Sequence, residues 1–397
     1  MAASDLTTVA YIYKRDYTDR KTGDLAQRNH PLFKMISKEG GFDGSGFYYP
    51  IRSGNPQGVS GTFADAQTAA SESKGKQPTA ARRAKFGVIT LNGEAMAAAT
   101  SKGAFMSLVN QETDGILEEM GDSFAFDLYR VGDGVRGRRS SISGAVITLT
   151  VADDARNFKV GMLVVADDTI TGLSLRGGSS DVTAVDEDAG TVTITSAADI
   201  TSFADNDYLF RKGDPGTCME GLSSHFPLTV PASGESWRGI DRSTDSRRYA
   251  GVRVDDTATT IEENAGLVAV KIGQVGQTAR IVTLNPIKFW EVCRRQGAKV
   301  TYDGGGMKAS VGFEGFDLHT PAGTLRAISD PDCETTRGYV LNMDTLYIKH
   351  LKGLPHIISD DGRANLRSAA ADDIEARARG WCNLICTRPG ANGVFSI

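Results

Sequence analysis

The sequence lacks the long hydrophobic runs of a membrane protein. Residues 162–166 are typical of its longest apolar stretches, whereas a membrane-spanning helix needs about 18 or more apolar residues in a row. The first twenty residues carry Lys14, Arg15 and Asp16 where a secretory signal peptide would need an apolar segment. We therefore expect a protein that folds in a cytoplasm and makes no contact with a membrane.

Cysteine is scarce and its spacing is irregular. The chain has 5 cysteines, an odd number that argues against a disulfide framework. Cys382 and Cys386 lie four residues apart without a histidine nearby, which is a weak match to a zinc site. The better interpretation of these side chains is that they are buried, reduced thiols that pack like small hydrophobic groups.

Catalytic and cofactor motifs are also missing. The sequence contains no Walker A motif, no His-Glu-x-x-His, no Gly-x-Ser-x-Gly and no Cys-x-x-Cys. The 5 histidines are scattered, and acidic pairs such as Asp360–Asp361 do not match a calcium-binding loop. We therefore predict no catalytic residue, no cofactor, no metal site and no enzymatic activity.

Charge is unevenly distributed along the chain. The net charge of −5 argues against a dedicated nucleic-acid-binding protein. Residues 46–92 carry six basic and two acidic side chains, a net charge of +4, whereas residues 144–214 carry five basic and twelve acidic ones, a net charge of −7. Two segments of opposite sign predict two surfaces with different roles.

The basic segment predicts an extended hairpin without a core of its own. Residues 47–51 and 84–91 have the composition of strands, and we expect them to pair with each other. Between them, residues 53–81 contain Val59 and Phe63 as their only apolar side chains larger than alanine or proline. Such a segment cannot bury enough area to offset its ordering entropy. We expect a neighbouring copy of the chain to hold it.

The remaining patterns predict an α+β fold with an insertion. Residues 103–129 repeat apolar side chains at three- and four-residue spacing, which predicts one long helix. Short alternating strands within residues 144–214, bounded by glycine-rich turns, predict a small barrel or sandwich. Residues 281–284 predict a buried strand, and Pro286 suits the first turn of the helix that follows. Residues 381–387 are the last clear strand.

The order of these parts resembles that of the major capsid proteins of tailed bacteriophages, which have the Hong Kong 97-type fold. The arm, the long polar hairpin and the long helix resemble that family's N-terminal arm, extended loop and spine helix. IVTLNPIKFWEVCRRQ (281–296) and FEGFDLHTPAGTLRAISDP (313–331) resemble elements of its axial domain. DDIEARARGWCNLICTRPGANGVFSI (372–397) resembles its closing strand.

The resemblance implies a division of the chain into six parts. They are an N-terminal arm (1–45), an extended loop (46–92), a peripheral domain with the spine helix (93–143), an inserted β-barrel-like domain (144–214), an axial domain (215–345) and a return to the peripheral domain (346–397). The insertion is absent from the minimal fold of the family. No long charged helical segment precedes the arm, so the resemblance implies a separate scaffolding protein.

The resemblance also implies a structural function in the virion. Pentamers and hexamers of the chain would assemble in the host cytoplasm into an icosahedral head around double-stranded DNA, with portal and scaffolding proteins, an optional decoration protein and non-specific contact with the DNA. The acidic segment is expected to face away from that DNA, because like charge near phosphates is unfavourable. The candidate inter-subunit contact residues are Val59, Phe63, Lys74, Lys76, Arg82, Arg83 and Trp290.

Two alternative functions, and the question of a covalent bond between subunits, stay open. The chain could be an encapsulin-type shell protein of a bacterial compartment, or, as a weaker alternative, an enzyme with a β accessory domain. Some relatives of the capsid family join subunits by an isopeptide bond from a loop lysine, and Lys74 and Lys76 lie in the corresponding region. The preferred interpretation is that both are solvated lysines, because a reactive amine needs desolvation.

Overall fold

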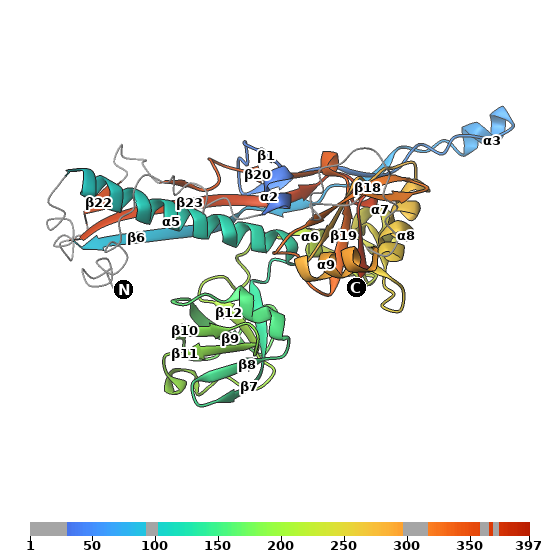
Figure 1. The fold of residues 1–397 in the computed structure, drawn as a ribbon. Helices are drawn as coiled ribbons and strands as arrows, with labels where there is room; N and C mark the ends of the chain where they lie inside the picture. Colours follow the sequence, from blue (N-terminus) through green and yellow to red (C-terminus); the bar gives the residue numbers. More distant parts are fainter. Residues whose placement is uncertain (1–29, 93–101, 297–316, 358–364, 368–372) are drawn as a thin grey trace, which may run out of the picture.

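The computed structural model describes residues 30–92, 102–296, 317–357, 365–367 and 373–397. The long helix α5 (Lys102–Tyr129) runs beside one sheet, a second sheet with its helices lies at the other end, a small barrel hangs below, and a thin ribbon projects outward (Figure 1). Residues 1–29 of the expected arm and the pair Asp360–Asp361 lie outside the described residues. Within the described ranges, no helix combines the length and apolarity that a membrane crossing requires.

The first sheet supports α5 along its length. Strand β23 pairs antiparallel with β6, β20, β21 and β22, and β1 adds to β20 in parallel. The strands are β1 (Ser37–Glu39), β6 (Arg83–Asn92), β20 (Leu346–His350), β21 (His356–Ile357), β22 (Asn365–Arg367) and β23 (Asp373–Cys386). The predicted helix at 103–129 and the predicted strand at 84–91 are both confirmed.

Two glycines let α5 lie close to this sheet. A Cβ atom on Gly87 of β6 would lie 2.7 Å from the Ile116 side chain, and one on Gly380 of β23 would lie 2.7 Å from Phe124. Both distances are shorter than side-chain atoms tolerate. Phe124 and Leu128 are fully buried in the core cluster beneath the helix. The approach of helix and sheet therefore depends on the absence of side chains at positions 87 and 380.

The second sheet has the order β15-β24-β19-β16-β18-β17. Its strands are β15 (Val252–Val254), β16 (Ile281–Leu284), β17 (Asp317–Thr320), β18 (Gly323–Ser329), β19 (Arg337–Leu341) and β24 (Gly393–Ser396). The helices near it are α6 (Leu222–His225), α7 (Ser246–Ala250), α8 (Ile261–Gly273) and α9 (Pro286–Gln296). Thr260 and Glu263 form a capping box that starts α8. The predicted strand at 281–284 and the helix start at Pro286 are confirmed.

The end of the chain differs from the prediction. The strand expected at 381–387 is the end of β23, a strand of 14 residues that begins at Asp373. The chain then re-enters the second sheet as β24, so the last strand is β24 and not residues 381–387. The pattern missed β24 because Gly393–Ser396 contains only two large apolar side chains, Val394 and Phe395, which is too short a run to predict a strand.

Six strands close into a barrel in the order β10-β11-β8-β7-β12-β9. They are β7 (Val135–Ser143), β8 (Val146–Leu149), β9 (Leu163–Asp167), β10 (Ser180–Asp186), β11 (Thr191–Ile194) and β12 (Tyr208–Arg211). The first strand begins at Val135, ahead of residue 144 where the insertion was expected to start. Two of the buried residues of this strand are arginines, Arg136 and Arg139, so its burial leaves no hydrophobic pattern in the sequence. Arg139 donates to the carbonyl of Phe203 at 2.8 Å.

The ribbon is built differently from the predicted hairpin. Strand β2 (Gly46–Tyr48) pairs with β5 (Thr79–Ala81), β3 (Ile51–Gly54) pairs with β4 (Lys74–Lys76), and α3 (Phe63–Thr68) forms the tip. The expected pairing of 47–51 with 84–91 is wrong, because β6 pairs with β23 from end to end. Pro50 separates β2 from β3, since proline has no N–H to donate to a ladder. The remaining short elements are α2 (Pro31–Met35), β13 (Ser236–Trp237) and β14 (Ile240–Asp241).

Candidate assembly surfaces

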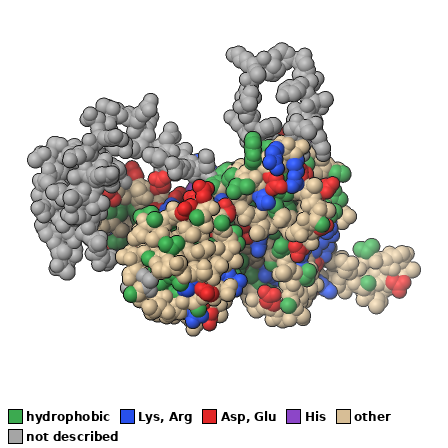
Figure 2. Space-filling model, turned by 60° about the horizontal axis from the view of Figure 1, so that its bottom comes forward, with side chains coloured by type: hydrophobic (Ala, Val, Ile, Leu, Met, Phe, Trp, Pro, Cys, Tyr) green, Lys and Arg blue, Asp and Glu red, His purple; other side chains and the backbone are tan. Residues whose placement is uncertain are grey.

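The tip of the ribbon exposes two large apolar side chains. Residues 55–75 are all exposed except for half-buried Ala66. The side chains of Val59 and Phe63 are 87% and 83% exposed. Helix α3 is capped by Thr62, whose hydroxyl accepts from the Asp65 N–H, but it buries no residue. Figure 2 shows the ribbon reaching away from the body with hydrophobic side chains on its surface. Local hydrogen bonds therefore shape the tip, and no hydrophobic core of the subunit holds it in place.

The root of the ribbon is tied to its own chain. Lys76 Nζ donates to the Asp241 carbonyl at 2.5 Å, and Arg82 donates to the Phe42 carbonyl at 3.3 Å. Arg83 donates to Glu220 at 2.8 Å. Three of the candidate contact residues, Lys76, Arg82 and Arg83, thus bind groups of the same copy, whereas Lys74 lies exposed on the ribbon.

A buried arginine that sequence reasoning missed fixes this root. Arg238 Nε donates to Glu220 at 2.6 Å, and its other nitrogens donate to the Tyr49 hydroxyl at 2.9 Å and the Leu384 carbonyl at 3.0 Å. Burial raises the pKa of Tyr49 to about 12, although the charge of Arg238 acts to lower it. Arg238 therefore joins the ribbon to both β23 and the segment before α6. The sequence around Arg238 contains no local pattern that predicts this role.

Trp290 lies on the outer face of α9. Its side chain is 63% exposed and that of Ile287 is 58% exposed, whereas Val292 and Cys293 on the opposite face are buried. Glu291 forms ion pairs with Lys288 and with Arg295 on the same helix. An exposed tryptophan beside an isoleucine is a typical anchor of a protein interface. Trp290 lies on α9 beside the second sheet, while Val59 and Phe63 lie on the ribbon, so the fold does not bring these candidates together.

The barrel contributes a separate acidic surface. The turn between β10 and β11 exposes Asp186, Glu187 and Asp188. Ion pairs join the barrel to α5, since Lys159 Nζ lies 2.5 Å from a Glu119 oxygen and 2.7 Å from an Asp122 oxygen. Acidic and basic surfaces are therefore placed on different parts of the molecule.

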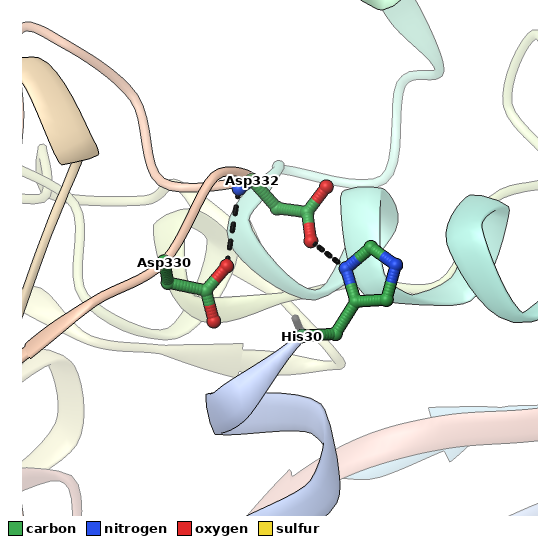
Figure 3. Close-up of side chains that lie close together, drawn as sticks. All are labelled: His30, Asp330 and Asp332. Carbon is green, nitrogen blue, oxygen red and sulfur yellow. Dashed lines mark hydrogen bonds and ion pairs between the residues drawn. The ribbon is translucent and has the colours of Figure 1, made fainter. Parts of the chain in front are cut away.

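His30, Asp330 and Asp332 lie close enough together to resemble a metal site (Figure 3). His30 Nδ1 bonds to Asp332, and its Nε2 lies 2.9 Å from Asp122 on α5. Burial acts to lower the pKa of His30, but its bonds to the two carboxylates outweigh this and raise the pKa to about 10. A protonated imidazole has no free lone pair for a metal. The cluster is therefore better described as an ion-pair latch that holds the start of α2 against α5.

We expect the His30 latch to make stability depend on pH on the alkaline side. Because the folded-state pKa lies above the ordinary value of 6.5, the ion pairs stabilise fully below pH 6.5 and are lost as the pH rises through about 10. Replacing His30→Gln should lower the free energy of unfolding at pH 6 by about 1–3 kcal/mol. Denaturant unfolding at pH 6, 8 and 10 measures this. A variant that loses as much stability between pH 6.5 and 10 as the wild type would contradict the latch.

All five cysteines are buried thiols, which confirms the interpretation of their packing. Burial raises the pKa of Cys386 to about 12 and raises that of Cys382 further. Since the thiolate is the reactive form, we expect no modification by iodoacetamide at pH 8 until the protein is unfolded. Mass spectrometry of the native and urea-treated protein tests this, and rapid native labelling of any cysteine would refute it.

The comparisons with known proteins bear on the fold. No family model matches the sequence, and no curated protein matches it. Among solved structures, the chain is similar to the Cyanophage A-1(L) capsid asymmetric unit, with a TM-score of 0.55 and 12% identity over 96% of this chain and 95% of that one. It also matches the capsid of an empty GTA particle (TM-score 0.47, 8% identity, 96% and 99% covered) and an encapsulin complex from Synechococcus elongatus PCC 7942 (TM-score 0.45, 7% identity, 100% and 96% covered). The first likeness shows that this chain has the fold of a phage capsid protein.

Proposed function

We propose that this chain is the major capsid protein of a tailed bacteriophage, with a Hong Kong 97-type fold, and that it builds the icosahedral head from pentamers and hexamers. The observation that carries the proposal is the ribbon, whose residues 55–75 project from the body almost entirely exposed. The tip of this ribbon, with Val59 and Phe63 exposed, adds no buried core to a monomer. In a shell it can lie on an adjacent subunit and bury both side chains.

The parts of the fold take separate roles in this proposal. The sheet of β6 and β23 with α5 is the peripheral domain, the sheet of β15–β19 and β24 is the axial domain, and the barrel is the insertion. Trp290 on α9 is proposed to pack near the local symmetry axis. Contacts spread over the ribbon and the axial domain reinforce one another, because a first contact raises the effective concentration for the next.

The lysines of the ribbon are proposed to act as solvated charges. Lys76 is already bonded to the Asp241 carbonyl and to Thr244, and Lys74 is exposed to water. Neither environment desolvates the amine, which isopeptide chemistry would need. Subunits are thus proposed to be joined without a covalent bond from these residues.

The acidic barrel is proposed to lie on the outer side of the shell, away from packaged DNA. Its turn at Asp186–Asp188 is exposed in the subunit, and anionic side chains beside phosphates would be unfavourable. Limited proteolysis of intact, DNA-filled particles tests the orientation. We expect cleavage at this turn, and complete protection would place the barrel inside.

Expression with and without neighbouring genes, followed by negative-stain microscopy, tests the function itself. We expect closed shells when a scaffolding protein is present, with portal protein and nuclease-protected double-stranded DNA in particles from infected cells. A shell that instead copurifies with one enzyme would favour the encapsulin alternative. A chain that stays monomeric in every condition would refute the shell function.

A further inference from the structure

A groove at the root of the ribbon carries an unusual concentration of arginine. It has a volume of about 620 Å³ and lies between the start of β3, helix α7 and the segment that follows β23. Its lining includes Arg52, Arg247, Arg248 and Arg388. None of the described residues that line it is acidic. Four guanidinium groups around one groove repel one another unless an anion lies between them.

One of these arginines is incompletely bonded. Arg247 Nε and Nη2 are buried and have no hydrogen-bond partner among the described residues. Two of the others are partly engaged, since Arg248 pairs with Asp245 at 2.9 Å and Arg52 donates to the Ser73 hydroxyl at 3.0 Å. Buried donors of native proteins are nearly always bonded. These two donors of Arg247 are therefore left unsatisfied within the described subunit, in the wall of a groove that another chain can enter.

The chemistry and size of the groove favour carboxylates. A guanidinium presents parallel N–H donors that match both oxygens of a carboxylate or phosphate. A DNA duplex, whose major groove alone is about 12 Å wide, is too broad to enter a cavity of about 620 Å³. An extended acidic peptide segment is narrow enough to lie along it. The chain itself has an excess of carboxylates, with a net charge of −5.

We propose that this groove binds an acidic segment of a second copy of the chain, with Arg247 in its half-buried wall and Arg52 and Arg388 at the exposed rim. The position supports this occupant, because β3 forms one wall of the groove and continues into the exposed ribbon. The groove therefore lies beside the surface that a second copy is proposed to cover. The inference rests on the proposed shell function and adds the site and its charge to it.

Zero-length cross-linking identifies the occupant. The variant Arg388→Lys places an amine at the exposed rim, and a carbodiimide joins such an amine to any carboxylate in contact with it. Assembled particles are prepared from a mixture of ¹⁴N- and ¹⁵N-labelled chains, so that a mixed-isotope peptide pair shows a bond between copies. We expect the introduced lysine to join to an Asp or Glu of another copy. Arg248→Lys is the matched control, since its neighbour Asp245 belongs to the same copy.

A charge reversal measures the contribution of the site. Arg388→Glu should reduce shell formation about tenfold or more at low salt, because a repulsive charge in an interface opposes association. Arg138→Glu, at an exposed arginine of the barrel, should leave assembly within about twofold. Thermal unfolding of the unassembled variants shows whether each still folds.

The outcomes separate this inference from the shell function. If the wild type never assembles, the shell function fails. If it assembles but the introduced lysine joins only to its own copy or to nothing, the groove proposal fails alone. If that lysine is protected from acetylation in DNA-filled particles and reactive in empty ones, phosphates occupy the groove, and the proposal is overturned.

Discussion

Removal of the ribbon tip is expected to give a folded monomer that forms no shells. The deletion takes out residues 56–72 and changes Ser73→Gly, so that Asn55 and the new glycine form a two-residue turn, a sequence favoured in tight hairpins. Strands β3 and β4 keep their pairing. The root contacts of Lys76 and Tyr49 also remain. Almost no buried apolar area is lost, because α3 buries no residue.

Circular dichroism and thermal unfolding should therefore match those of the wild type, while electron microscopy should show no closed particles. A finer variant, Val59→Ser with Phe63→Ser, should also block assembly if these side chains are the anchors. Val160→Ser with Leu173→Ser is its matched control, since these barrel residues are 67% and 85% exposed. An unfolded deletion variant would mean that the tip belongs to the subunit's own core. Normal shells from either ribbon variant would contradict the role proposed for the tip.

The sequence predicted those elements whose signal is local. Helix α5 shows a repeating apolar stripe, and β16 with α9 shows a buried run followed by proline. The pairing of strands that are distant in sequence has no such local signal. Strand β6 pairs with β23, with Thr90 opposite Glu375. No pattern in either segment identifies the other as its partner. The sequence therefore favours the nearer segment, residues 47–51, as the partner of β6, and this prediction is wrong.

The candidate surfaces were predictable to a similar extent. The scarcity of large apolar residues singled out Val59 and Phe63, and the structure places both exposed at the tip. The arginine groove could not be found this way, because Arg52, Arg247 and Arg388 meet only after three distant segments have folded together. The Arg238 junction was missed for the same reason, since its partners Tyr49 and Leu384 are 189 and 146 residues away in sequence.

Loss of the buried lysine between the sheet, the long helix and the barrel is expected to destabilise the subunit strongly. Lys85 Nζ of β6 lies 2.8 Å from Asp127 Oδ2 on α5 and 3.9 Å from Asp214 at the end of the barrel. Arg136 of β7 lies 3.3 Å from the same Asp214. The side chains of Lys85 and Asp127 are 11% and 1% exposed. Burial raises the pKa of Asp127, and the charge of Lys85 opposes this rise.

Lys85→Met keeps most of the side-chain volume but leaves the buried carboxylate of Asp127 without its closest cation. Breaking a buried pair in this way costs about 3–5 kcal/mol, which urea unfolding of the unassembled protein measures. Adding Asp127→Asn should restore much of the loss, because a neutral amide oxygen can still accept from the Met219 N–H. Lys288→Met, in a half-exposed pair with Glu291, should cost less than about 1 kcal/mol. If Lys85→Met cost no more than that control, the charge of Lys85 would not hold β6, α5 and the barrel together.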